Sequence, residues 1–314
     1  LNSLFHVFAT SWRIGKFNGI GVIASQFGLA LSFSVHKVLA SLSNNLDVVL
    51  IGQKYGEQPT AEYYKSQGFK NLPIAHVVTP IAQVLLPTLS KLQDSPKDLA
   101  RFFLRSQKLI IFLLLPAYLL LFALAEPFAS IYFSEGETDW NIPLISNLLK
   151  VFSLSGIVGM FNPVFYSFFQ ITKSSKQINT IIVAQRLVFV LLILFAVQYG
   201  LLILAIGKLV AEAIALIINL FFGKKYFYRA QLYALLRYLP LVLLLSFVSA
   251  AVAFFTFHHL PLFSSTILQF LTACVLSAFI YLSLSFLLNK GGFQLFQELV
   301  SSKINNADEG VDVT

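Results

Sequence analysis

The sequence predicts an all-α polytopic membrane protein with about eight transmembrane helices. Eight apolar stretches fill most of the 314-residue chain, and each can cross about 30 Å of hydrocarbon as a helix. The composition agrees, with 57% hydrophobic and 11% charged residues, against about 45–50% and about 25% in average globular domains. The gaps between the stretches alternate between rich and poor in Lys and Arg, which is typical of a chain that crosses a bilayer repeatedly.

The apolar runs are too long for the strands of a membrane barrel, and helices satisfy their own backbone hydrogen bonds in hydrocarbon. The longest helices are expected to tilt or to extend into water. The predicted helices cover residues 20–52, 59–90, 98–133, 142–170, 176–198, 200–222, 232–256 and 264–288.

These helices divide the chain into four parts. We expect a cytoplasmic entry segment over 1–19, a transport lobe of six helices over 20–225, two additional helices over 226–290 and a polar tail over 291–314. The tail loses the apolar character and is expected to be disordered. Because the chain opens with Leu and its single Met lies at position 160, we expect it to be the C-terminal part of a longer protein.

The distribution of positive charge predicts the orientation. Fifteen of the 22 Lys and Arg fall in the entry segment, in alternate gaps and in the tail, and the gap at 134–141 contains three acidic residues and no Lys or Arg. By the positive-inside rule, both ends of the chain lie in the cytoplasm, and the protein is expected in the inner membrane of a bacterium. The net charge of +8 therefore indicates contact with anionic lipid headgroups rather than nucleic acid.

The sequence contains no pattern for catalysis, metal binding or a cofactor. The P-loop, G-x-S-x-G and H-E-x-x-H motifs are missing, and the adjacent His258 and His259 have no acidic or cysteine partner nearby in sequence. The single cysteine, Cys274, cannot form an intrachain disulfide. We therefore expect a transporter rather than an enzyme, without ATP hydrolysis of its own.

The first predicted helix carries the densest set of polar residues. Lys37 and Asn44 fall on one narrow arc, with Asp47 on the adjoining one. A charge inside a bilayer costs on the order of 2.5–3.5 kcal/mol, so this face is expected to contact water or protein. Alternatively, Asp47 and the asparagines lock neighbouring helices together near the outer surface.

The second predicted helix has a proline every seven residues, at 73, 80 and 87, with His76 and Gln83 between them on the same face. Each proline removes a backbone hydrogen bond. A bent helix with freed carbonyls suits the wall of a cavity, although a kinked packing helix remains the alternative. Lys70 adds positive charge near the outer end, while Lys65 fits an interfacial side chain whose ammonium reaches water.

Further charges lie in the later helices. Lys208 and Glu212 are four residues apart and are predicted to pair with each other. Arg186 lies deep in the fifth helix and is a cavity candidate, whereas Lys150 is close enough to a helix end to reach water. Glu126, before Pro127, is expected to mark a helix boundary. The cationic face of Arg101, Arg105 and Lys108 favours contact with phospholipid headgroups.

Three segments resemble polysaccharide biosynthesis flippases, the Wzx-like branch of the multidrug/oligosaccharidyl-lipid/polysaccharide exporter superfamily. They are Asn44–Gly52 (NNLDVVLIG), followed by Tyr55-Gly56 and Tyr63-Tyr64; Leu86–Asp94 (LPTLSKLQD); and Ala125–Phe128 (AEPF), followed by Tyr132-Phe133. The resemblance is specific from about residue 40 to 135 and only compositional afterwards.

The resemblance implies a protein of twelve to fourteen helices in two lobes around a water-filled cavity, of which this chain would keep the C-terminal lobe and two further helices. Such proteins move undecaprenyl-diphosphate-linked oligosaccharides from the cytoplasmic to the outer leaflet by alternating access. Lys37, with Lys70 or Arg186, would then attract the diphosphate. In related flippases arginines do this, and lysines offer only point charges. Membrane lipids and other polysaccharide-assembly proteins are the implied partners.

Two other functions stay open. A cation-coupled drug or small-solute exporter of the same superfamily would use Asp47 or Glu212 to bind a proton or sodium. A membrane polymerase or glycosyltransferase would need a large external loop with catalytic groups, and the longest external gap has only about eight to ten residues.

Overall fold

The computed structural model describes residues 45–92, 94–133, 139–172, 175–224, 229–260, 263 and 265–294. Within these ranges every regular element is helical, and six helices are long and apolar enough to cross a membrane. The predicted all-α polytopic fold is therefore confirmed. The first predicted helix is described only from residue 45 onward.

The helical elements follow the predicted order closely. Residues 45–55 form the first described helix, and a single helical turn at 290–294 is the last. Between them lie α3 (Glu57–Pro73), η1 (Ile74–Val78), α4 (Thr79–Lys91), α5 (Pro96–Ala123), α6 (Ala125–Phe133), α7 (Ile142–Gly159), α8 (Asn162–Thr172), α9 (Ser175–Ala196), η2 (Val197–Tyr199), α10 (Leu201–Gly223), α11 (Arg229–His259) and α12 (Thr266–Leu288).

Two helices that we predicted as continuous are each broken near a proline. The segment predicted over 98–133 divides into α5 and α6, and the one predicted over 142–170 divides into α7 and α8. Pro127 and Pro163 have no N–H to donate to the carbonyls four residues earlier, and these carbonyls belong to the last residues of α5 and α7. A proline is accepted in the first turn of the next helix, so a boundary forms before each of them.

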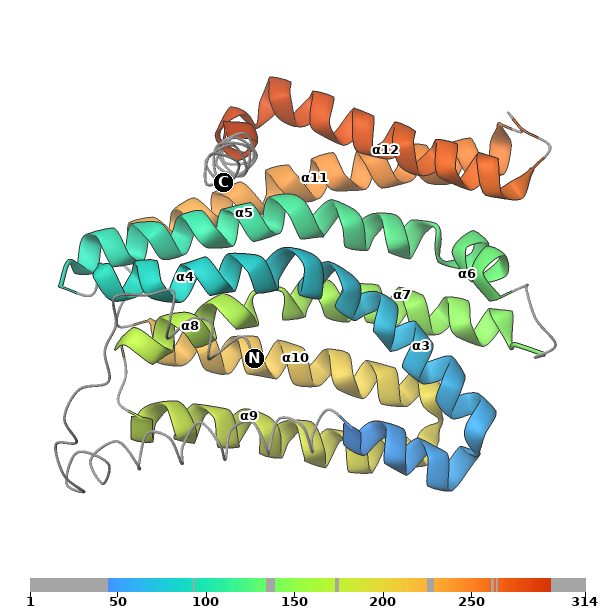
Figure 1. The fold of residues 1–314 in the computed structure, drawn as a ribbon, viewed down its shortest axis with the longest axis horizontal. Helices are drawn as coiled ribbons and strands as arrows, with labels where there is room; N and C mark the ends of the chain where they lie inside the picture. Colours follow the sequence, from blue (N-terminus) through green and yellow to red (C-terminus); the bar gives the residue numbers. More distant parts are fainter. Residues whose placement is uncertain are drawn as a thin grey trace, which may run out of the picture.

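The proline-rich helix bends as the sequence predicts. Between α3 and α4, η1 is a π-helical turn in which the Thr79 N–H donates to the Ile74 carbonyl, five residues earlier. Pro80 cannot donate to the His76 carbonyl, which favours this wider turn. α3 runs obliquely to α4 in Figure 1. The bent helix is not among the six apolar spans, in keeping with the polar side chains it carries.

The helices pack in layers that place α10 and α9 on one side of α7 and α8, and α5, α11 and α12 on the other (Figure 1). The largest apolar cluster joins α4, α5, α8 and α11, and a second joins α7, α9 and α10 with Ile51 and Tyr63. Gly56 and Gly200 have φ angles of 87° and 107°, a region that glycine enters without strain. They allow the tight turns before α3 and α10.

α11 and α12 form the outermost layer beside α5 (Figure 1). α12 presents a row of large apolar side chains outward, among them Leu271, Val275 and Phe279. On its inner side, the Tyr281 hydroxyl donates to the Phe112 carbonyl at 2.7 Å. These two helices thus attach to the bundle through α5. The predicted division at residue 225 into a lobe and two added helices stays a prediction.

Candidate functional site

A polar recess of about 520 Å³ lies among α3, α8, α9 and α10. Polar and charged side chains that line a recess inside an apolar helical bundle need water or a polar ligand as a partner. Most of the residues around it are polar or charged: Asn45, Tyr64, Gln67, Lys70, Asn71, Asn162, Gln185, Arg186, Lys208 and Glu212.

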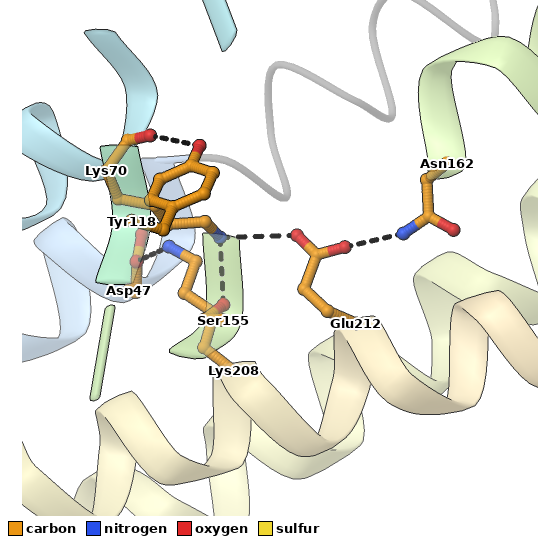
Figure 2. A network of polar contacts seen from close by, with 7 residues as sticks. All are labelled: Asp47, Lys70, Tyr118, Ser155, Asn162, Lys208 and Glu212. Atoms are coloured by element: carbon orange, nitrogen blue, oxygen red, sulfur yellow. Dashed lines mark hydrogen bonds and ion pairs between the residues drawn. The ribbon is translucent and has the colours of Figure 1, made fainter. Parts of the chain in front are cut away.

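A fully buried ion pair forms one edge of the recess. The Lys208 ammonium on α10 donates to the Asp47 carboxylate on the helix over 45–55, as Figure 2 shows. The Asp47 side chain is 0% exposed and the Lys208 side chain 6%. The second Asp47 oxygen accepts from the Val48 N–H at 3.0 Å. Removing the Lys208 charge would leave the Asp47 carboxylate without its partner in a site that water does not reach.

A second pair, Lys70 with Glu212, is looser. The Lys70 ammonium donates to the Ser155 hydroxyl at 2.9 Å and lies 3.4 Å from the Glu212 carboxylate (Figure 2). The Lys70 side chain is 5% exposed, but that of Glu212 is 28% exposed. Tyr118 supports the Lys70 backbone, because its hydroxyl donates to the Lys70 carbonyl at 2.8 Å. This pair joins α3, α7 and α10 at the wall of the recess.

A chain of carboxamides continues from Glu212 toward α9. Asn162 donates to Glu212 at 2.8 Å, Asn219 donates to Asn162 at 2.9 Å, and Gln185 donates to Asn219 at 2.8 Å. These amides also line a smaller pocket of about 230 Å³, which shares Asn162, Pro163, Gln185 and Arg186 with the recess. The recess therefore extends between α8, α9 and α10 as a polar path.

The structure brings three of the seven predicted site residues together. Lys70 and Arg186 line the recess, and Asp47 lies directly behind Lys208 in its wall. Lys37, Asn44 and the side chain of Gln83 lie outside the described residues.

The expectation that His76 lines a cavity stays a prediction, because the structure places it outside this recess. His76 is exposed and is not part of the recess lining. It lies in the π-helical turn, where the extra residue per turn rotates the helix out of the seven-residue register that we used.

The predicted pairing of Lys208 with Glu212 is wrong. Lys208 pairs with Asp47, and Glu212 pairs with Lys70. Spacing along one helix places two side chains on one face, but the partners on neighbouring helices decide the pairing. The sequence reasoning also missed Ser155, Asn162, Gln185 and Asn219, because it weighed mainly ionisable residues; polar amides inside apolar runs were the available signal.

Other predicted features lie away from the recess. The Lys65 ammonium lies 4.3 Å from the centre of the Trp140 ring, which fits an exposed interfacial lysine. His258 stacks on Phe254, with ring centres 4.1 Å apart. In the searched part of the chain, no three His, Cys, Asp or Glu side chains come together as a possible metal site.

The first part of the chain is similar to a known protein family. Residues 1–141 match the model of a family described as polysaccharide biosynthesis protein. The match covers somewhat less than half of the 314-residue chain. The resemblance to Wzx-like flippases, whose specific motifs fall within these residues, is thereby confirmed.

Solved structures show the same fold over most of the chain. The chain is similar to "Lipid II flippase MurJ, inward closed conformation", with a TM-score of 0.69 and 17% identity over 91% of this chain and 59% of that one. It is also similar to a chain named "protein A", with a TM-score of 0.53 and 15% identity over 90% of this chain and 66% of that one. The chain thus spans about three fifths of the flippase's length. No curated protein matches.

Proposed function

We propose that this chain is the C-terminal lobe, with two further helices, of a flippase that moves undecaprenyl-diphosphate-linked oligosaccharides across a bacterial inner membrane by alternating access. The observation that carries the proposal is the polar recess inside an apolar helical bundle, lined by Lys70, Arg186 and Lys208. The match of residues 1–141 to a polysaccharide biosynthesis family and the fold similarity to a lipid II flippase support it.

The chemistry of the recess fits a diphosphate headgroup. A polyanion that enters hydrocarbon loses the water around it, so a protein that carries it across must surround it with cations and water of its own. The described lining has three cations against one carboxylate, so its balance is positive even with Asp47 paired behind it. The Arg186 guanidinium adds the planar, bidentate recognition of phosphate that lysines lack. The carboxamides of Asn162, Gln185 and Asn219 can bind sugar hydroxyls or phosphate oxygens beside it.

A cation-coupled exporter is less well supported. That function needs a carboxylate free to bind a proton or sodium, yet Asp47 is held by Lys208 and Glu212 by Lys70. A polymerase or glycosyltransferase is less well supported too, because only residues 134–141 connect α6 to α7. We also propose that both ends of the chain lie in the cytoplasm and that other polysaccharide-assembly proteins are its partners.

The proposal is tested by complementation with the full-length protein in a strain that lacks its own copy, reading surface polysaccharide and membrane abundance together. Lys70→Ala, Arg186→Ala and Lys37→Ala are expected to reduce surface polysaccharide at least tenfold while abundance stays within twofold. Lys65→Ala is the matched control, since it removes a lysine from the same helix as Lys70 but outside the recess.

Two results would count against the proposal. The first is full complementation by both Lys70→Ala and Arg186→Ala. The second is full complementation by Lys37→Ala together with failure of Asp47→Asn at normal abundance, which would favour the cation-coupled exporter.

A further inference from the structure

The two ion pairs of the site differ in how easily they can be exchanged. The Asp47 side chain is 0% exposed, and that of Lys208, which lines the recess, is 6% exposed. Glu212 is 28% exposed, lines the recess and lies 3.4 Å from Lys70, beyond ordinary hydrogen-bond length. Water or a ligand in the recess can therefore reach Glu212 but not Asp47.

Glu212 is the only carboxylate among the described residues that line the recess. Its position is well defined: one oxygen faces Lys70, and the other accepts from the Asn162 amide at 2.8 Å. The carboxylate also lies over Gly159, where a Cβ would come within 3.3 Å of Glu212 Cδ. The fold thus leaves room for an anion beside Lys70, and Glu212 fills it.

We propose that Glu212 is a resident anion that occupies Lys70 while the recess has no substrate, and that the substrate's diphosphate displaces it. This inference rests on the proposed flippase function and names the residue that controls access to its phosphate site. Asn162 can retain the Glu212 carboxylate after Lys70 has moved to the phosphate, because their hydrogen bond does not involve Lys70.

The exchange serves two physical needs. The Lys70 side chain is only 5% exposed. An unpaired ammonium there would be costly, so Lys70 needs an anion in the empty protein. The same carboxylate competes with phosphate, which weakens binding and assists release at the opposite side. Tight uniform binding would instead hold the substrate in the recess.

The test measures binding of undecaprenyl diphosphate to the full-length protein in detergent. Glu212→Gln keeps the shape and the contact with Asn162 but removes the charge, and it is expected to lower the Kd about tenfold, or about 1.4 kcal/mol. Glu126→Gln is the matched control, because Glu126 is exposed at the start of α6 and does not line the recess; its Kd should stay within twofold. Glu212→Ala replaces the Gln variant if that variant does not fold.

A second background separates exchange from simple repulsion. In Lys70→Gln protein, removing Glu212 is expected to change the Kd by less than threefold, because the cation that Glu212 occupies is gone. An equal tenfold gain in that background would overturn the inference in favour of through-space repulsion. Unchanged or weaker binding by Glu212→Gln, with weaker binding by Lys70→Gln, would overturn it while leaving the flippase proposal intact. If no recess variant alters binding, the flippase proposal itself fails.

Discussion

The buried pair of Asp47 and Lys208 gives a quantitative prediction about stability. Lys208→Met keeps most of the side-chain volume but leaves the Asp47 carboxylate without its partner. Since Asp47 is 0% exposed and its other oxygen accepts from the adjacent Val48 N–H, water cannot replace the ammonium. Breaking a buried pair in this way costs about 3–5 kcal/mol.

The looser pair provides the internal comparison. Lys70→Met leaves Glu212 with 28% exposure and its hydrogen bond to Asn162. Water in the recess can solvate that carboxylate, so the expected cost is about 1 kcal/mol, the upper value for solvent-exposed pairs. The difference between the two lysine variants therefore measures how well each carboxylate is sealed.

The assay is chemical denaturation of the purified full-length protein in detergent, followed by helical circular dichroism. The double variant Asp47→Asn with Lys208→Met should be at least about 2 kcal/mol more stable than the sum of the single effects predicts, because no charge is left alone. Additivity within about 0.5 kcal/mol, or a Lys208→Met variant no less stable than Lys70→Met, would refute the reasoning.

Three further predictions test the packing and the recess. Gly156→Ala should lower the free energy of unfolding by about 1–3 kcal/mol, because its Cβ would lie 2.4 Å from the Tyr118 ring; shortening Tyr118 to Leu should restore part of the loss in the same denaturation assay. Tyr281→Phe should cost about 0.5–1.5 kcal/mol by removing the hydrogen bond to Phe112 that ties α12 to α5, and no loss would show that apolar contacts alone hold α12. In a Cys274→Ala background, Gln185→Cys should react with a charged, membrane-impermeant thiol reagent in opened vesicles. Leu191→Cys should not react, because Leu191 is 65% exposed on α9 and is expected to face lipid. If neither cysteine reacts, the recess is dry; if both react equally, this face of α9 contacts water.

Much of the fold could be predicted from the sequence. Runs of apolar residues set the helices, and the structure confirms their order, with ends that differ by a few residues. The proline rhythm correctly predicted a bend in the second helix. A boundary was expected at Glu126, close to the break that the structure places after Ala123, although the helix was drawn as continuous over 98–133. The break after Gly159 was missed, although Pro163 was visible, because hydropathy continues across it and only the backbone hydrogen-bond pattern records the interruption.

The site was less predictable than the fold. Lys70, Asp47 and Arg186 were found because a charge in an apolar run is costly and therefore conspicuous. His76 lies outside the recess, in the π-helical turn, and the amides Asn162, Gln185 and Asn219 were overlooked because their burial cost is smaller. The sequence gives no measure of which polar side chains face the same space.

The amino-acid sequence alone determined that this is a multi-pass membrane protein, where its helices run and which family its first part resembles, since hydrophobicity, proline and local motifs act over one or two helical turns. Tertiary structure decided the partners. Lys208 meets Asp47 across 161 positions and Lys70 meets Glu212 across 142, because opposite charges in an apolar bundle pair wherever helix packing brings them together, irrespective of their separation along the chain.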